Sequence, residues 1–190
     1  MKNNTRTKRH GSGTHESDFA FRIITLVHDN PLLPLFKDPD KLLKAAGLGP
    51  GQRVLEIGCG PGYFTLPAAK IVGEQGLVYA IDVHPMAVQR VQRKVTESGV
   101  RNVRTLLTNA SSTGLPDQCI DRAFIFGMPR VVGGQKKVIT EIRRLLRPGG
   151  ELAYMKSRGS ERALIEAVEK GGLSFSRKDG RILLFKNISE

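Results

Sequence analysis

The segment Val54-Leu55-Glu56-Ile57-Gly58-Cys59-Gly60-Pro61-Gly62 decides the fold of this chain. A short apolar strand runs directly into closely spaced glycines, and a helical pattern follows. The glycines let the backbone turn sharply and approach a ligand without a Cβ in the way, and the first N–H groups of the following helix point at the same place. The dinucleotide fingerprint G-x-G-x-x-G fails, because Tyr63 stands where its third spaced glycine is needed. The segment therefore predicts a ligand-binding turn of a different kind.

Strands and helices alternate from this segment to the C-terminus. The expected strands are residues 54–57, 77–81, 103–107, 123–126 and 152–155, and the expected helices are residues 61–72, 85–98, 134–147 and 161–170. Two further strands, 173–175 and 182–185, flank a turn at Lys178-Asp179-Gly180 and predict a terminal hairpin. Five βα steps that end in a hairpin predict an α/β fold with an open, mostly parallel sheet and helices on both faces.

The 190 residues are enough for one domain with a full hydrophobic core. Residues 1–16 are polar and basic, and we expect them to be a disordered tail. Residues 17–50 are expected to be a small helical segment, in which Asp38 is an N-cap, Pro39 the first helical residue and Gly47 the C-terminal stop. Residues 51–190 are then the α/β domain.

The composition excludes several classes of protein. Hydrophobic residues make up 39% and charged residues 25%, which excludes a disordered or coiled-coil chain. No apolar run approaches the ~20 residues that a membrane span requires, and the N-terminus lacks the hydrophobic stretch of a secretory signal, so we expect a cytoplasmic protein. Cys59 and Cys119 are too few for a disulfide framework or a four-ligand zinc site, and we expect no metal.

The charge balance is strongly basic. The chain carries 30 Lys and Arg against 18 Asp and Glu, a net charge of +12. Such a surface attracts nucleic acid without specificity. A solvated basic surface is the favoured interpretation, because no aromatic residues are interleaved with the charges as single-strand binding usually requires. Nucleic-acid binding stays open, with no specific motif behind it.

The glycine segment resembles the E/D-x-G-x-G-x-G loop of the class I S-adenosylmethionine-dependent methyltransferases. The resemblance extends from about residue 49 to residue 187 and rests on further landmarks in the right order. These are the lead-in at residues 50–56, Asp82 at the end of the second strand, Asn109-Ala110 after the third, Leu115-Pro116-Asp117 before the fourth and Leu146-Arg147-Pro148-Gly149-Gly150 before the fifth. The sequence as a whole most resembles the small-molecule and quinone-biosynthesis (type 11-like) methyltransferases. This resemblance implies a single Rossmann-like domain with strand order 3-2-1-4-5-7-6, in which only the last strand is antiparallel.

The resemblance also implies that S-adenosyl-L-methionine (SAM) binds at the carboxyl ends of the first two strands. Asp82 would accept hydrogen bonds from both ribose hydroxyls; the alternative is a helix N-cap ahead of Pro85. Asn109, where relatives usually carry Asp, would contact the adenine amine, and Glu56 would organise the glycine loop or contact the methionine end through water. The whole set expected at the cofactor is Glu56, Gly58, Cys59, Gly60, Gly62, Asp82, Val83, Met86, Asn109, Ala110 and Phe126.

The acceptor side of the site is less defined. Orientation supplies much of the acceleration of methyl transfer, so the reaction does not require an obvious general base. The acceptor is expected beyond the fourth strand, near residues 126–130, with the apolar residues 17–36 as a lid. Those residues would otherwise pack on another subunit, which leaves a homodimer open. His28 and Asp29 are the only titratable pair there, although a helix C-terminus is their favoured interpretation.

Three functions remain open on the sequence alone. The favoured one is transfer of the sulfonium methyl group to a small-molecule, lipid-like or quinone-type nucleophile by in-line displacement. The alternatives are an RNA- or protein-modifying methyltransferase and a non-catalytic SAM-binding domain.

Overall fold

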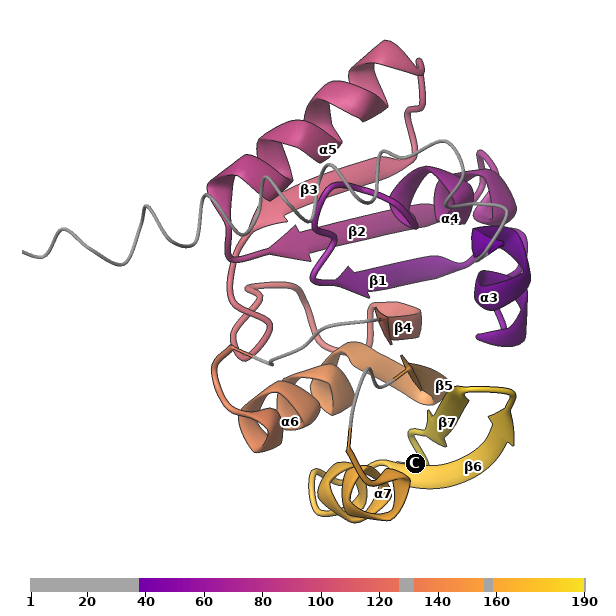
Figure 1. The fold of residues 1–190 in the computed structure, drawn as a ribbon, viewed down its shortest axis with the longest axis vertical. Helices are drawn as coiled ribbons and strands as arrows, with labels where there is room; N and C mark the ends of the chain where they lie inside the picture. Colours follow the sequence, from indigo (N-terminus) through magenta and orange to yellow (C-terminus); the bar gives the residue numbers. More distant parts are fainter. Residues whose placement is uncertain (1–37, 127–131, 156–158, 190) are drawn as a thin grey trace, which may run out of the picture.

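A seven-stranded sheet forms the centre of the molecule. The computed structural model describes residues 38–126, 132–155 and 159–189. The strands are β1 (Arg53–Ile57), β2 (Leu77–Asp82), β3 (Val103–Leu107), β4 (Ile120–Phe126), β5 (Leu146–Met155), β6 (Ser174–Asp179) and β7 (Ile182–Lys186). Figure 1 shows them from top to bottom in the order β3-β2-β1-β4-β5-β7-β6. β1 to β5 pair in parallel, and β7 lies antiparallel between β5 and β6. The predicted fold class and strand order are therefore confirmed.

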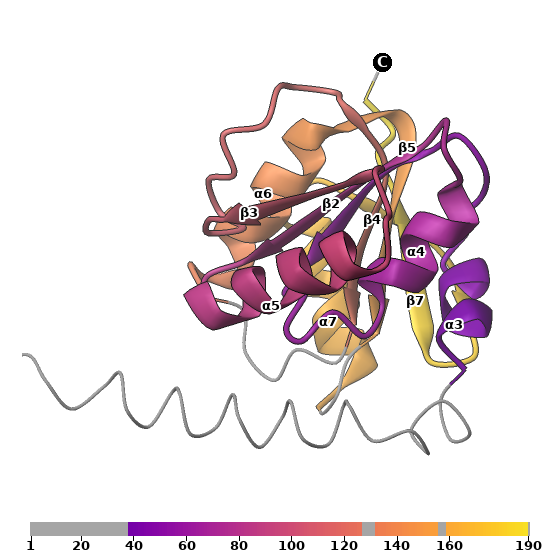
Figure 2. The same ribbon diagram turned by 90° about the horizontal axis from the view of Figure 1, so that it is seen from above.

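Helices cover both faces of this sheet. They are α3 (Pro39–Ala45), α4 (Thr65–Val72), α5 (Pro85–Glu97), α6 (Gln135–Leu145) and α7 (Glu161–Glu169). Apolar side chains of α3, α4 and α5 share one core with the sheet, and those of α6 and α7 share the other. Figure 2 shows α5 and α6 on opposite sides of β2 and β3. The described residues contain no helix with the length and apolar character needed to cross a bilayer.

The expected short helix before the sheet is confirmed in its details. The side chain of Asp38 accepts hydrogen bonds from the backbone N–H groups of Asp40 (3.0 Å) and Lys41 (3.2 Å), and Pro39 is the first helical residue. Gly47 follows the helix with φ +82°, a conformation that glycine adopts without strain. Leu43 is fully buried in the core beside α4. α3, which belongs to the expected helical segment 17–50, is therefore part of the core of the domain.

Several expected boundaries are wrong, and the expectation of five βα steps is also wrong. The connection from β3 to β4, residues 108–119, contains no helix. α4 begins at Thr65 instead of residue 61, because Gly60 and Gly62 have positive φ angles that interrupt a helix. β5 begins at Leu146, directly after α6, because that residue already pairs with Ile120 of β4.

The terminal hairpin is also longer than expected. β6 continues through the polar residues 176–179, and the turn falls at Gly180, with φ +54°. β6 is an edge strand whose side chains are mostly exposed, so it needs no apolar alternation. Pairing with the buried strand β7 extends it instead.

Gly76 lies so close to neighbouring atoms that a larger residue there is expected to destabilise the protein. A Cβ atom there would lie 2.6 Å from the Cβ of Val72 and 2.7 Å from the carbonyl oxygen of Gln52. Because the carbonyl belongs to the backbone, Gly76→Ala should shift the junction of α4 and β1. We expect a loss of about 1–3 kcal/mol in the free energy of unfolding, measured by urea denaturation. Gly49→Ala is the matched control, since its Cβ would meet only the Gln52 side chain, at 3.9 Å. Equal stability of the two variants would contradict the prediction.

Candidate functional site

The carboxyl ends of β1 and β2 meet at a small cleft. It lies next to the point where the sheet order reverses, since β1 pairs with β2 on one side and β4 on the other. The cleft is lined by Ile57, Gly58, Ile81, Asp82, Val83, Thr108, Ala110 and Val132. Four of the expected cofactor residues are among these, namely Gly58, Asp82, Val83 and Ala110. The cleft combines one carboxylate with mostly apolar walls.

Asp82 joins the glycine loop to the start of α5. One carboxylate oxygen accepts a hydrogen bond from the Gly60 N–H group (2.9 Å), and the other accepts one from the His84 N–H group (2.9 Å). The N-cap of α5 is His84, so the alternative of an Asp82 N-cap is wrong. Each carboxylate oxygen has a further acceptor position. Asp82 can therefore hold the loop and still accept hydrogen bonds from two hydroxyl groups.

The loop itself is fixed to β2 through its backbone. The N–H groups of Gly58 and Cys59 both donate to the carbonyl oxygen of Ile81, at 2.9 and 3.0 Å. A Cβ at Gly60 would meet no atom within 4 Å, whereas one at Gly62 would lie 3.0 Å from Val91 of α5. The space beside Gly60 is therefore open to a ligand, whereas the absence of a side chain at Gly62 lets the loop pack closely on α5.

The Cys59 thiol is buried against this loop. Burial is the largest influence on its pKa and raises it far above the usual value. A neutral thiol is a poor nucleophile, so Cys59 fills space in the core.

Glu56 is a buried carboxyl group in β1, directly below the loop. Its side chain is only 2% exposed, and the Thr65 hydroxyl donates a hydrogen bond of 2.6 Å to it. Burial raises the pKa of Glu56 to about 8, against the opposing effect of this hydrogen bond. Because Thr65 is the first residue of α4, the contact links β1 to α4 on the far side of the glycine turn. This contact favours the first of its two expected roles, the organisation of the loop.

The raised pKa of Glu56 predicts a pH dependence of stability. Its pKa is higher in the folded protein (about 8) than the reference value of 4.5, so the folded state binds more protons between these limits. Stability from this group is therefore present at low pH and is lost as the pH rises toward 8, by up to about 1.4 kcal/mol per pH unit. Urea denaturation at pH 5.5 and pH 8 should show a larger loss in the parent protein than in Glu56→Gln. An equal loss of unfolding free energy in the two proteins would contradict the raised pKa of Glu56.

Asn109 lies beside the cleft but does not line it. Its side-chain oxygen accepts hydrogen bonds from the N–H group (2.9 Å) and the hydroxyl (3.0 Å) of Ser111. The expected acceptor for an adenine amine is thus already used in a local turn. The neighbours Thr108 and Ala110 line the cleft instead.

Two further expected residues, Met86 and Phe126, do not line the cleft. Met86 is half-buried at the start of α5. Phe126 is buried at the end of β4, with its ring centroid 5.2 Å from that of Phe64. The ring of Phe64 also makes an edge-to-face contact with that of Tyr63, with 4.8 Å between the centroids. The three rings form an aromatic cluster where β4 ends. His28, Asp29, residues 17–36 and residues 127–131 lie outside the described residues.

Sequence reasoning missed several residues that line the cleft. Ile57 and Ile81 lie at the ends of β1 and β2, just before expected residues, and Thr108 directly follows β3. Their positions at the carboxyl ends of strands could have indicated that they line the cleft. Val132 comes from the segment after β4, and only the folded chain brings it to β2.

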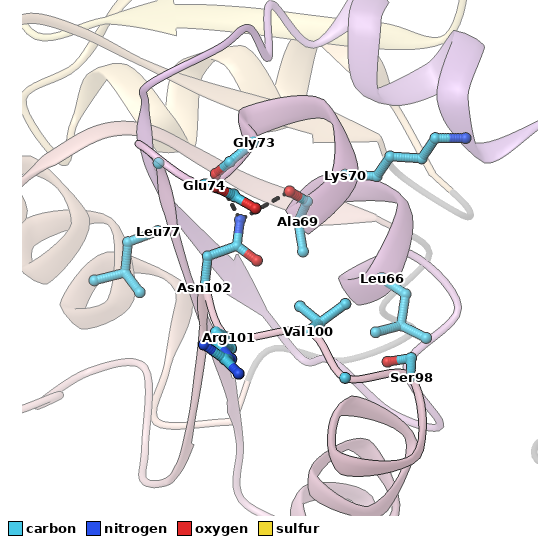
Figure 3. Close-up of a pocket in the computed structure, with 12 residues that line it drawn as sticks. Leu66, Ala69, Lys70, Gly73, Glu74, Leu77, Ser98, Val100, Arg101 and Asn102 are labelled. Atoms are coloured by element: carbon cyan, nitrogen blue, oxygen red, sulfur yellow. Dashed lines mark hydrogen bonds between the residues drawn. The ribbon is translucent and has the colours of Figure 1, made fainter.

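A larger hollow lies elsewhere. It has a volume of about 1060 Å³ and lies near the amino ends of β2 and β3, between the C-terminal ends of α4 and α5. Figure 3 shows the side chain of Asn102 there, donating hydrogen bonds to the carbonyl oxygens of Ala69 (2.9 Å) and Gly73 (2.7 Å). None of the expected cofactor residues lines this hollow. Its size therefore does not identify it as the cofactor site, and the position and chemistry of the glycine loop favour the smaller cleft.

Comparison with known proteins gives a consistent result. The model of a family described as a methyltransferase domain matches residues 48–178. Aklanonic acid methyltransferase DauC of Streptomyces sp. (strain C5) is 33% identical over 108 residues, which covers 55% of this chain and 47% of that protein. Ubiquinone/menaquinone biosynthesis C-methyltransferase UbiE of Hydrogenovibrio crunogenus is 31% identical over 144 residues, covering 74% and 56%. The chain thus spans about half the length of the curated relatives it matches.

A solved structure matches over more of its length. The crystal structure of a SAM-dependent methyltransferase from Aquifex aeolicus superposes with a TM-score of 0.75 at 28% identity. The match covers 85% of this chain and 95% of that one.

Proposed function

Because the chain belongs to the class I SAM-dependent methyltransferases, we propose that it transfers the sulfonium methyl group to a small-molecule nucleophile of the quinone type. The observation that carries the proposal is the cleft at the carboxyl ends of β1 and β2, where Asp82 fixes the glycine loop. The choice of acceptor is supported by the relatives, which are named for quinone biosynthesis and for aklanonic acid.

The cofactor of this enzyme is SAM, and the residues of the cleft fit its chemistry. Asp82 presents carboxylate oxygens suited to ribose hydroxyls. The apolar side chains of Ile81, Val83 and Val132 suit the faces of a purine. The open space at Gly60 lets the backbone of the loop approach a ligand closely. When bound, SAM supplies a methyl group that is already activated for displacement.

The protein would contribute binding, orientation and exclusion of water. Asp82 and the glycine loop would hold the nucleoside, and the region beyond Phe126 would hold the acceptor in line with the methyl group. The aromatic cluster of Tyr63, Phe64 and Phe126 offers edges and faces that suit a flat ring. No step in this scheme requires a metal ion or a covalent intermediate with the protein.

The proposal is tested with SAM carrying a labelled methyl group. The purified protein is incubated with a reduced naphthoquinone, with total RNA and with a protein extract in separate reactions, and labelled products are identified by mass spectrometry. We expect label on the quinol and formation of S-adenosylhomocysteine. Label on RNA or protein in its place would overturn the choice of acceptor. SAM binding without turnover on any acceptor would favour a non-catalytic domain.

We retain residues 17–36 as the proposed lid of the acceptor site. Deleting residues 1–16 should leave SAM affinity and turnover unchanged. Deleting residues 1–36 keeps Asp38 and α3, and with them the packing on α4, so the sheet should still form. This second deletion should abolish turnover because the transfer would be open to water. Full activity of the shorter protein on its acceptor would show that other residues hold the substrate.

A further inference from the structure

β3 is an edge strand with one side open. It pairs with β2 and, within the described residues, with no other strand. The Val78 N–H group donates to the carbonyl of Asn102, and the Thr108 N–H group donates to the carbonyl of Asp82. The even-numbered residues of β3 therefore direct their backbone groups toward β2. In a parallel sheet, successive residues of a strand point their backbone groups to opposite sides. The N–H and C=O groups of Val103, Thr105 and Leu107 therefore point away from β2, toward the open side.

A groove runs beside this open edge. It has a volume of about 570 Å³ and is lined by Gln92, Val95, Thr96, Val100, Arg101, Val103, Arg104 and Thr105. Its walls are thus α5 on one side and β3 on the other. It adjoins the large hollow of Figure 3, because Val100 and Arg101 line both. An extended chain could follow β3 and continue past Arg101 into the hollow.

The surroundings of the groove are cationic. Arg101 and Arg104 line it and are exposed, and the adjoining hollow carries one further cation, Lys70, and one carboxylate, Glu74. The side chain of Arg93 on α5 lies 3.6 Å from Glu97 in an exposed pair that contributes little. The pKa of Lys94 is lowered by burial and by two neighbouring arginines, Arg90 and Arg93, which shows that cations gather on this helix.

The other edge of the sheet differs in this respect. On β6, Lys178 forms an ion pair with Glu161 (2.8 Å), and Arg177 lies 3.4 Å from Glu151. Arg177 and Lys178 are therefore paired within the protein. Near β3, Arg101 and Arg104 form no ion pair with any described carboxylate, which leaves their positive charge for an anionic partner.

We propose that the open edge of β3 binds an extended acidic segment of a partner protein by strand addition. The segment would pair its backbone with Val103, Thr105 and Leu107, and its carboxylates would lie near Arg101 and Arg104. Leu107, whose side chain is 56% exposed, gives an apolar contact at one end. The partner would leave the SAM cleft free, so the interaction is independent of the methyl acceptor.

A peptide fits the groove better than a nucleic acid does. The edge offers both backbone donors and backbone acceptors, whereas a phosphate chain offers acceptors alone. None of the residues that line the groove or the hollow is aromatic, so bases would find no ring to stack on.

The test uses the full-length protein and a fluorescent peptide of alternating glutamate and valine. Thr105→Pro removes an outward N–H group that makes no bond to β2, and it should weaken peptide binding at least about tenfold. Arg101→Glu with Arg104→Glu should weaken it by a similar factor. The matched control reverses two exposed charges on α6, Lys136→Glu with Lys137→Glu, and should bind as the parent does. SAM affinity and the thermal midpoint should stay unchanged in all variants.

Two outcomes would overturn strand addition. One is equal binding of the peptide by the parent and both groove variants. The other is loss of binding in the charge variant alone, together with equally tight binding of polyuridylic acid, which would indicate a general polyanion or nucleic-acid surface.

A basic peptide of alternating lysine and valine should not bind. Because SAM affinity is measured in parallel, failure of this proposal is distinguishable from failure of the proposed function.

Discussion

Replacing Asp82 with alanine is expected to reduce the affinity for SAM at least about a hundredfold. The carboxylate would provide two charge-assisted hydrogen bonds to the ribose, each worth about 1.5–3 kcal/mol. The variant would also release the N–H groups of Gly60 and His84, which Asp82 holds at 2.9 Å, so the loop would lose its fixed position. Titration calorimetry measures the effect directly.

Two further variants make this experiment specific. Asp179→Ala removes an exposed carboxylate at the end of β6, far from the cleft in the sheet order, and should leave SAM affinity unchanged. Asp82→Asn keeps the shape but loses the charge, so its affinity should fall between those of the parent and the alanine variant. Unchanged affinity in Asp82→Ala, with a normal circular dichroism spectrum, would remove Asp82 from the cofactor site.

Replacing Glu151 with glutamine is expected to cost about 3–5 kcal/mol of unfolding free energy, the usual effect of breaking a buried ion pair. The Glu151 side chain in β5 is 9% exposed and pairs with Arg122 of β4 and Arg177 of β6. Burial already lowers the pKa of Arg122, so loss of the carboxylate would leave a half-buried guanidinium group without the carboxylate it pairs with. Urea denaturation at pH 7 gives the value.

The control is an ion pair of the same type on the surface. Glu161 lies 2.8 Å from Lys178, and both side chains are about half exposed. Glu161→Gln should therefore change the unfolding free energy by less than about 1 kcal/mol. The double variant Arg122→Met with Glu151→Leu should recover much of the lost stability, since it leaves no charge buried. A cost below about 1 kcal/mol for Glu151→Gln would mean that water reaches Arg122 and replaces its partner.

Much of the sheet could be predicted because its signals are local. The apolar run 54–57, the glycines after it and Asp82 at the end of β2 are short patterns whose physical meaning does not depend on the rest of the chain. The capping of α3 by Asp38 is equally local, and the structure has it as expected. The same holds for the position of Asp82 in the cleft, because parallel strands bring their carboxyl ends together.

Other features depend on contacts between distant segments. The polar run 176–179 has no strand pattern, and it becomes β6 because β7 offers a partner. Asn109 could be placed after β3 from the sequence, but its rotamer follows from the hydrogen bonds to Ser111. Val132 reaches the cleft from beyond β4, and no periodicity indicates such a contact.

The position of β7 constrains the order in which the chain can fold. Its residues 182–185 are all at most 2% exposed. They pair with β6 on one side, and residues 183–185 also pair with β5 on the other. During synthesis the half of the sheet that carries the cleft of β1 and β2 can assemble while the backbone groups along one side of β5 are still unpaired. That edge stays open until residue 186 has been made, and it is then the place where an incomplete chain would associate with another. Closure of this side of the sheet is therefore a late event, although the residues of the candidate cleft are all made by residue 132.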